Sequence, residues 1–287
     1  MDKASNKRRS MMIFGASVIA CACIGVLLRT ISLFFFYDAD IGYFTRGAVL
    51  PVIFHVFILV AAIACAVLCF FPKITLEPTN FGESKTAQML YAFPALTTLY
   101  SLILQVNLIG EYSDLGQVIP RIELFILIFN ALALVYFVLS IFGARINAGV
   151  SVVLGVFSML WLTLMLVSLY FDMYIQINSP NKTIMAFALV SAVLFLAGEI
   201  RLPLKEKKAK IRLFSAAFAV LLLSTSSIPT LIAHFAGALG SGYTATIGDL
   251  ICLTLLAPVC ARFVKLCFAE APSVSDNDAT QPESDIE

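Results

Sequence analysis

Charge is scarce in this chain of 287 residues. Asp, Glu, Lys and Arg together make up 13% of it, against about 25% in ordinary globular domains. A water-soluble monomer needs many more charged side chains on its surface, so the composition excludes that class. The net charge of +1 and the small polar fraction also exclude a basic nucleic-acid-binding protein and a disordered chain.

Motifs of catalysis and cofactor binding are also missing. The sequence holds no His-Glu-x-x-His zinc motif and no glycine-rich phosphate loop. Gly248-Asp249 resembles part of an intramembrane protease motif, but Thr246 stands where that motif requires glycine. All seven cysteines fall in apolar segments, so no disulfide framework is expected outside them. We predict no catalytic residues, no cofactor and no metal ion, and an intramembrane enzyme is the least favoured function.

Apolar residues are abundant, at 60% of the chain. About 20 consecutive apolar residues cross the hydrocarbon core of a membrane as a helix. Eight segments meet this requirement, and we predict an all-α, polytopic bundle of eight transmembrane helices with no soluble domain. The predicted spans are 11–36, 47–71, 86–110, 118–143, 148–171, 182–203, 211–238 and 243–268. Two positions weaken the pattern: Pro120-Arg121 opens the fourth span, and the run 224–227 with Pro229 interrupts the seventh.

The distribution of Lys and Arg predicts the orientation. With residues 1–10 as a basic cytoplasmic N-terminus, the outer loops hold Arg46, Arg121 and Lys182, and Arg29 lies inside the first span. All other basic residues fall on the cytoplasmic side, which is the bias that sets membrane topology. Residues 269–287 are rich in carboxylates without Lys or Arg and are expected to form an acidic, disordered cytoplasmic tail. Both termini are therefore predicted to be cytoplasmic.

Two segments resemble each other and a recurrent element of an uncharacterised family of multi-pass bacterial membrane proteins. The first is residues 32–44, from Ser32 to Phe44, and the second combines 168–172 with 178–182. The resemblance covers about 35 residues and implies no activity. It implies a location in the bacterial cytoplasmic membrane and suggests two parallel four-helix halves, with the first and fifth spans equivalent.

Ionisable groups inside spans are costly and are candidates for function. In the predicted topology they gather toward the outer side and form the candidate lining of an outward-facing polar cavity: Arg29, His55, Asn107, Glu123, His234 and Asp249. The alternative is that most are interfacial or snorkelling side chains with one structural pair. For that pair we predict Arg29 with Asp249, because Gly248 permits close helix approach. Glu199, on the inner side, is expected to pair with Arg201 or with the basic sixth loop.

The sixth loop supplies a second candidate contact. Lys205, Lys207, Lys208 and Lys210 are placed to bind anionic lipid, at about 1 kcal/mol for each residue near the surface; the alternative is that these charges only fix topology. The predicted function is a small-molecule transporter or binding protein whose partners are the lipid bilayer and a small-molecule ligand, without nucleic acid. The alternative is a non-catalytic membrane scaffold or sensor that acts through the sixth loop and the tail.

Overall fold

The computed structural model describes residues 3–39, 41–71, 85–142, 148–171, 179–201, 209–239 and 247–268, and this part of the chain is helical except for one short hairpin. The elements are α1 (Lys3–Phe36), β1 (Tyr37–Asp38), β2 (Tyr43–Phe44), α2 (Val49–Phe70), α3 (Lys85–Leu90), α4 (Ala92–Asp114), α5 (Arg121–Ile141), α6 (Ala148–Phe171), α7 (Pro180–Glu199), α8 (Ala209–Phe235) and α9 (Ile247–Phe268). The prediction of an all-α fold is confirmed.

In the part of the chain that the structure describes, eight helices are long and apolar enough to cross a membrane, and they coincide with the eight predicted spans. The third is divided at Tyr91 into α3 and α4, because Pro94 lacks the amide that would bond the carbonyl of Leu90. The fourth begins at Arg121, with Pro120 as an extended N-cap residue. The expected interruption of the seventh span is wrong, since α8 continues through Pro229 to Phe235.

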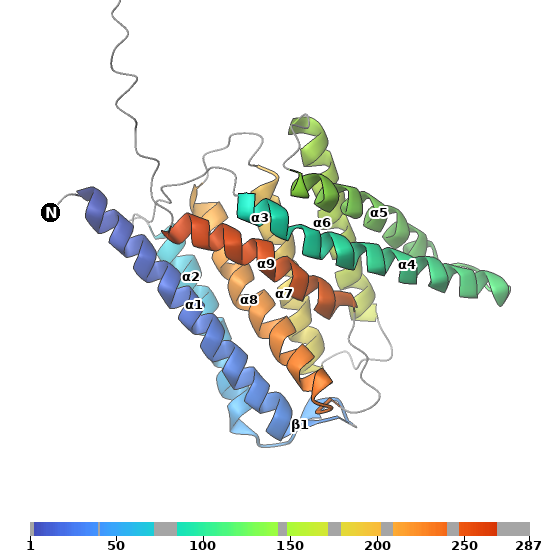
Figure 1. The fold of residues 1–287 in the computed structure, drawn as a ribbon. Helices are drawn as coiled ribbons and strands as arrows, with labels where there is room; N and C mark the ends of the chain where they lie inside the picture. The colour runs from blue at the N-terminus through green and yellow to red at the C-terminus, as the bar shows by residue number, and fades with distance from the viewer. Residues whose placement is uncertain are drawn as a thin grey trace, which may run out of the picture.

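Helix α8 lies at the centre of the bundle. It packs against α1, α7, α9 and α2, and most of its residues are buried. Figure 1 shows α8 between α1 and α7, with α4 and α5 displaced to one side. Helices α4, α5 and α6 pack in sequence, and this group joins the rest through contacts of α6 with α7 and of α4 with α9. The third and seventh spans therefore occupy different environments, although the suggested repeat would make them equivalent.

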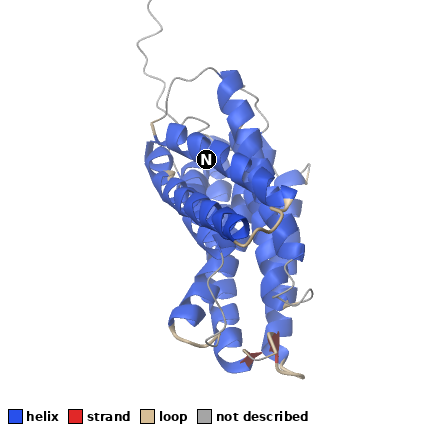
Figure 2. Ribbon diagram, turned by 90° about the vertical axis from the view of Figure 1, so that its right-hand side faces the viewer, coloured by secondary structure: helices blue, strands red, loops and turns tan. Residues whose placement is uncertain are grey.

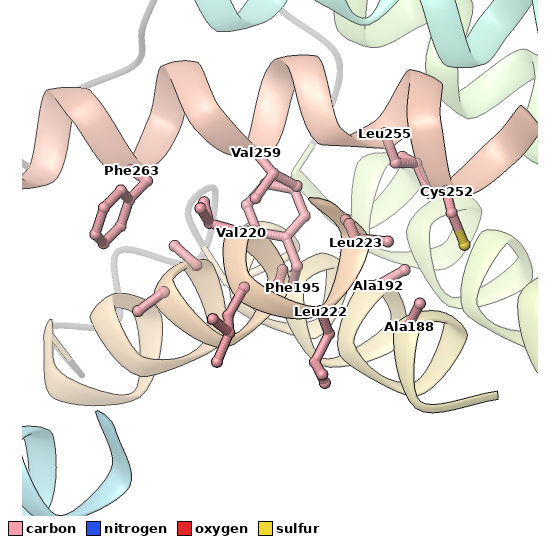
Figure 3. Close-up of a cluster of buried hydrophobic side chains, with 14 of the residues drawn as sticks. Ala188, Ala192, Phe195, Val220, Leu222, Leu223, Cys252, Leu255, Val259 and Phe263 are labelled. Atoms are coloured by element: carbon pink, nitrogen blue, oxygen red, sulfur yellow. The ribbon is translucent and has the colours of Figure 1, made fainter. Parts of the chain in front are cut away.

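One part of the apolar core lies where α7, α8 and α9 meet (Figure 3). Ala188 and Ala192 are the small residues that α7 contributes, while α8 contributes Val220, Leu222 and Leu223. From α9, Cys252, Leu255, Val259 and Phe263 complete the cluster. All of these side chains are buried, so α8 is held mainly by close packing.

The two ends of the bundle are distinct. At one end the N-terminal half of α1 meets the C-terminal end of α9, where the rings of Phe14 and Phe263 are 6.4 Å apart. The opposite end carries the β1–β2 hairpin, in which Tyr37 pairs with Phe44 (Figure 2). Gly42 adopts φ 77° in the hairpin turn, a conformation that favours glycine. For brevity we call these the terminal end and the hairpin end.

Candidate functional site

Arg29 belongs to the buried stripe of α1. Residues Met11, Phe14, Val18 and Ala22 precede it on the same helix face and are buried, as expected for positions three or four residues apart. The Arg29 side chain is 2% exposed. A buried guanidinium without hydrogen-bond acceptors would be strongly destabilising, so the surrounding helices must provide acceptors for it.

Gly25, one turn before Arg29, brings α1 close to α8. A Cβ atom at Gly25 would lie 2.7 Å from Cγ2 of Thr225 and 2.9 Å from Cδ1 of Ile58. Contacts this short do not occur between carbon atoms, so a larger residue would push α1 away from α8. The absence of a side chain at Gly25 therefore places Arg29 directly against the backbone of α8.

The guanidinium meets α8 where that helix lacks an internal hydrogen bond. Pro229 lies inside α8, and because proline has no amide hydrogen, the carbonyl of Thr225 loses its usual partner four residues later. Nη1 of Arg29 donates to this carbonyl at 2.7 Å and to that of Ser226 at 3.1 Å. Arg29 thus supplies a donor where proline removed one, which explains how α8 remains continuous. Buried backbone groups need such replacement partners wherever water is excluded.

The second nitrogen of the guanidinium joins α1 to two other side chains. Nη2 donates to Oδ1 of Asn181, on α7, and to Oγ1 of Thr230, on α8, both at 3.0 Å. Hydrogen bonds that involve a charged group contribute about 1.5–3 kcal/mol each. Arg29 therefore connects α1, α7 and α8 at one point. We call the group Arg29, Asn181, Thr225, Ser226 and Thr230 the Arg29 cluster.

Hydroxyl groups of α8 are satisfied within the helix, with one exception. Thr225 donates to the carbonyl of Leu221, Ser227 to that of Leu223 and Thr230 to that of Ser226, the usual arrangement for buried Ser and Thr in helices. The Ser226 hydroxyl is also buried, yet within the described residues it has no hydrogen-bond partner. It lies on the residue whose carbonyl accepts from Arg29.

Asn181 enters the cluster from the first turn of α7. The N-cap residue Ser179 accepts from the amide of Lys182 at 3.3 Å, and Pro180 occupies the first helical position, where proline is favoured. Nδ2 of Asn181 is buried and has no hydrogen bond to the described residues, although the Tyr37 hydroxyl interacts with this side chain from nearby. Burial raises the pKa of the Tyr37 phenol above its ordinary value, and Asn181 and Arg29 oppose that shift.

Two further buried charges lie near the hairpin end. Lys182 is 4% exposed and its Nζ donates to the carbonyl of Tyr170 at 3.0 Å. Asp249 is 2% exposed in the first turn of α9, where the helix dipole favours a carboxylate. The four hydrogen bonds described above link Arg29 to α7 and α8, and the pairing of Arg29 with Asp249 stays a prediction.

The other predicted cavity residues lie apart from the Arg29 cluster. Glu123, half-buried on α5, accepts from Gln105 on α4, and Asn107 is exposed on α4. Neither α4 nor α5 is a principal neighbour of α1 or α8 (Figure 1). His55 is half-buried, bonds the carbonyl of Pro51 in its own helix and packs against Phe44 and Phe54. His234 is half-buried beside Phe235.

A second ionic group lies toward the terminal end. Glu199 accepts from Arg262 through Nη2 at 2.8 Å and through Nε at 3.2 Å, and both residues are buried. The expectation that Glu199 pairs with Arg201 or the sixth loop is wrong, because α9 presents Arg262 directly to the end of α7. Tyr91 and Tyr136 lie close enough to interact with the Glu199 carboxylate. We call this group the Glu199–Arg262 pair.

The remaining predictions concern segments that are mostly outside the described residues. Lys205, Lys207, Lys208 and the tail 269–287 are among these segments. Lys210, in the first turn of α8, is described and half-buried. No group of three or more His, Cys, Asp or Glu side chains suited to a metal ion occurs among the described residues.

Sequence reasoning missed Asn181, Ser226 and Arg262 as functional or structural partners. Asn181 is inconspicuous because it lies near the predicted start of a span. One signal was available: Pro229 marks the Thr225 carbonyl, four residues earlier, as a backbone acceptor without an amide partner. Comparison with protein-family models, curated proteins and solved structures finds no match to this chain.

Proposed function

We propose that this is a multi-pass integral membrane protein that binds or transports a small polar molecule at the Arg29 cluster. The observation that carries the proposal is a buried guanidinium on the carbonyls of a proline-containing helix, beside two buried polar atoms without partners in the described residues. Ionisable groups and irregular backbone hydrogen bonding within a membrane characterise ligand sites. The same features in the core of a purely structural bundle would reduce its stability.

Membrane insertion is supported by the surface of the helices. One face of α2 carries exposed aliphatic side chains at Val52, Val56, Leu59, Ile63 and Val67. Their spacing of three or four residues forms a continuous stripe along the helix. Lipid is the environment that such a stripe favours. With the proposed topology, both termini are cytoplasmic, the hairpin end faces outward, and the Arg29 cluster lies nearer the outer surface of a bacterial cytoplasmic membrane.

Reporter fusions test the insertion and the orientation. Fusions at residues 40, 113 and 178 should report an extracytoplasmic position, and fusions at 78, 146, 207 and 275 a cytoplasmic one. This pattern follows from eight crossings that begin in the cytoplasm. Two neighbouring fusions on the wrong side would remove a span and contradict the proposed topology.

Mass spectrometry of the protein purified in native lipid tests the binding role. A small molecule should be retained by the wild type and lost from Asn181→Ala, because Asn181 lies in the cluster. The matched control is Asn107→Ala, which changes an exposed asparagine of α4 and should leave retention unchanged. A stoichiometric protein partner without a retained small molecule would instead support the scaffold or sensor role. Equal retention by both variants would place the site elsewhere.

A further inference from the structure

The two buried polar atoms of the Arg29 cluster belong to residues that accept from different nitrogens of one guanidinium. Asn181 is 8% exposed and Ser226 is 1% exposed. Each residue already accepts one hydrogen bond from Arg29. Oδ1 of Asn181 accepts from Nη2, and the backbone oxygen of Ser226 accepts from Nη1. Nδ2 of Asn181 and Oγ of Ser226 have no partner of hydrogen-bond geometry in the described residues, and the Tyr37 hydroxyl interacts with the Asn181 side chain from nearby. A buried polar atom without a hydrogen bond destabilises the protein, so the site favours an occupant that supplies the missing partner.

The chemistry of these atoms selects the kind of group that satisfies them. An amide nitrogen can only donate, and a serine hydroxyl donates when its neighbour is an acceptor. The occupant must therefore present acceptor oxygens. A cation is disfavoured by the adjacent Arg29, whereas a negative charge is attracted to it at short range. An oxyanion meets both requirements, while a neutral molecule meets only the first.

We propose that Asn181 Nδ2 and Ser226 Oγ bind the oxyanion group of a small ligand, a carboxylate or a phosphate, beside the Arg29 guanidinium. This inference rests on the proposed function, for which it defines the ligand class. Arg29 holds the site in place through α7 and α8, and the two donors make the direct contacts. Hydrogen bonds from neutral donors to a charged acceptor are stronger than those between neutral groups, so these donors bind an oxyanion more strongly than a neutral molecule.

Thermal unfolding of the whole protein in lipid nanodiscs tests the ligand class. The probes are acetate, succinate and inorganic phosphate, with acetamide as the neutral counterpart of acetate, all at constant ionic strength. At about five times its Kd, an oxyanion should raise the Tm by about 2–4 °C, whereas acetamide should not. A shift with acetate or succinate identifies a carboxylate ligand, and a shift with phosphate alone identifies a phosphate ligand. Equal shifts with acetate and acetamide, or no shift with any oxyanion, would overturn the proposal.

Two variants separate binding from folding. Asn181→Asp keeps the oxygen that accepts from Arg29 but removes the Nδ2 donor and adds a repelling charge. Ser226→Ala removes a hydroxyl without a partner and leaves the Ser226 carbonyl in place, so the Tm without ligand should be unchanged or higher. Each should weaken oxyanion binding about tenfold or more. The matched control is Ser227→Ala, because the Ser227 hydroxyl bonds within its own helix. Unchanged affinity in Ser226→Ala and Asn181→Asp would overturn the proposal.

The retained ligand distinguishes the failure of this inference from the failure of the proposed function. A neutral polar molecule that the wild type retains and Asn181→Ala loses would support the binding role and overturn the oxyanion proposal. An acid that is retained by the wild type and by Asn107→Ala, and lost from Ser226→Ala, would support both.

Discussion

Nη1 of Arg29 lies 2.7 Å from the carbonyl oxygen of Thr225, the oxygen that Pro229 leaves without an amide partner. Arg29 and Thr225 are far apart in sequence and belong to different helices, yet Arg29 supplies the hydrogen bond that the Thr225 carbonyl lacks within α8. A proline in a buried helix and an arginine in a neighbouring helix are each destabilising alone. Together, the arginine donates the hydrogen bond that the proline removed, and the carbonyl provides an acceptor for the buried guanidinium. The effects of replacing Arg29 and Pro229 on the free energy of unfolding should therefore be coupled.

The first prediction concerns this coupling. Pro229→Ala restores the amide at position 229, so the Thr225 carbonyl no longer depends on Arg29. Arg29→Met should therefore lower the free energy of unfolding by about 1 kcal/mol less in the Pro229→Ala background than in the wild type. Unfolding in denaturant in lipid measures the four variants. Pro258→Ala is the control, since Pro258 lies inside a different helix, α9, and should show no coupling. Equal costs of Arg29→Met in both backgrounds would exclude the compensation.

The second prediction concerns the close approach at Gly25. Gly25→Ala places a methyl group against Cγ2 of Thr225 and should destabilise the protein by about 1–3 kcal/mol, the usual cost of overpacking. Thr225→Ser removes that methyl group but keeps a hydroxyl at the same place, and it should recover part of the loss. Gly110→Ala is the matched control, because its Cβ would meet no atom within 4 Å. A loss of stability that Thr225→Ser does not reduce would contradict the contact.

The third prediction concerns the Glu199–Arg262 pair. Glu199→Gln or Arg262→Met leaves a buried charge without its counterpart and should lower the free energy of unfolding by about 3–5 kcal/mol. The double variant should lose less than the sum of the two. Arg201→Ala serves as the control, because Glu199 pairs with Arg262, and this change should remain within about 0.5 kcal/mol of the wild type. If Arg201→Ala lowered the free energy of unfolding as much as Arg262→Met does, Arg201 would be the partner of Glu199, as the sequence predicts.

The fourth prediction concerns the pairing of Arg29 with Asp249. Arg29→Ala and Asp249→Ala should each lower the yield of folded protein, and the double variant should lose less than their sum. Glu123→Ala is the comparison, because Glu123 accepts from Gln105 on a different pair of helices. Its effect should simply add to that of Arg29→Ala. If the effects of Arg29→Ala and Asp249→Ala on the yield of folded protein are strictly additive as well, the two charges do not pair.

The eight spans could be predicted because each depends on the local composition of a single segment. The partners of the buried charges could not, because they depend on how separate helices pack. Glu199 illustrates this difference: Arg201 is two residues away, yet the actual partner is Arg262 on α9. The Ser/Thr run of α8 predicts an interruption of the helix, whereas three of its four hydroxyl groups bond back to carbonyls of α8. Gly25, which brings Arg29 to α8, gives no signal without the neighbouring helix.

The distance along the chain between Arg29 and its acceptors has a consequence for biosynthesis. Arg29 and Thr225 are 196 residues apart, and ribosomes extend a chain at about 5–20 residues per second. The first span therefore waits about 10–40 s for the carbonyl that its arginine will bind. With the proposed membrane topology, Arg29 depends during that time on water, lipid headgroups or the insertion machinery. A ribosome stalled before α8 should leave α1 in exchange with such surroundings, and completion of the seventh span should fix it in place.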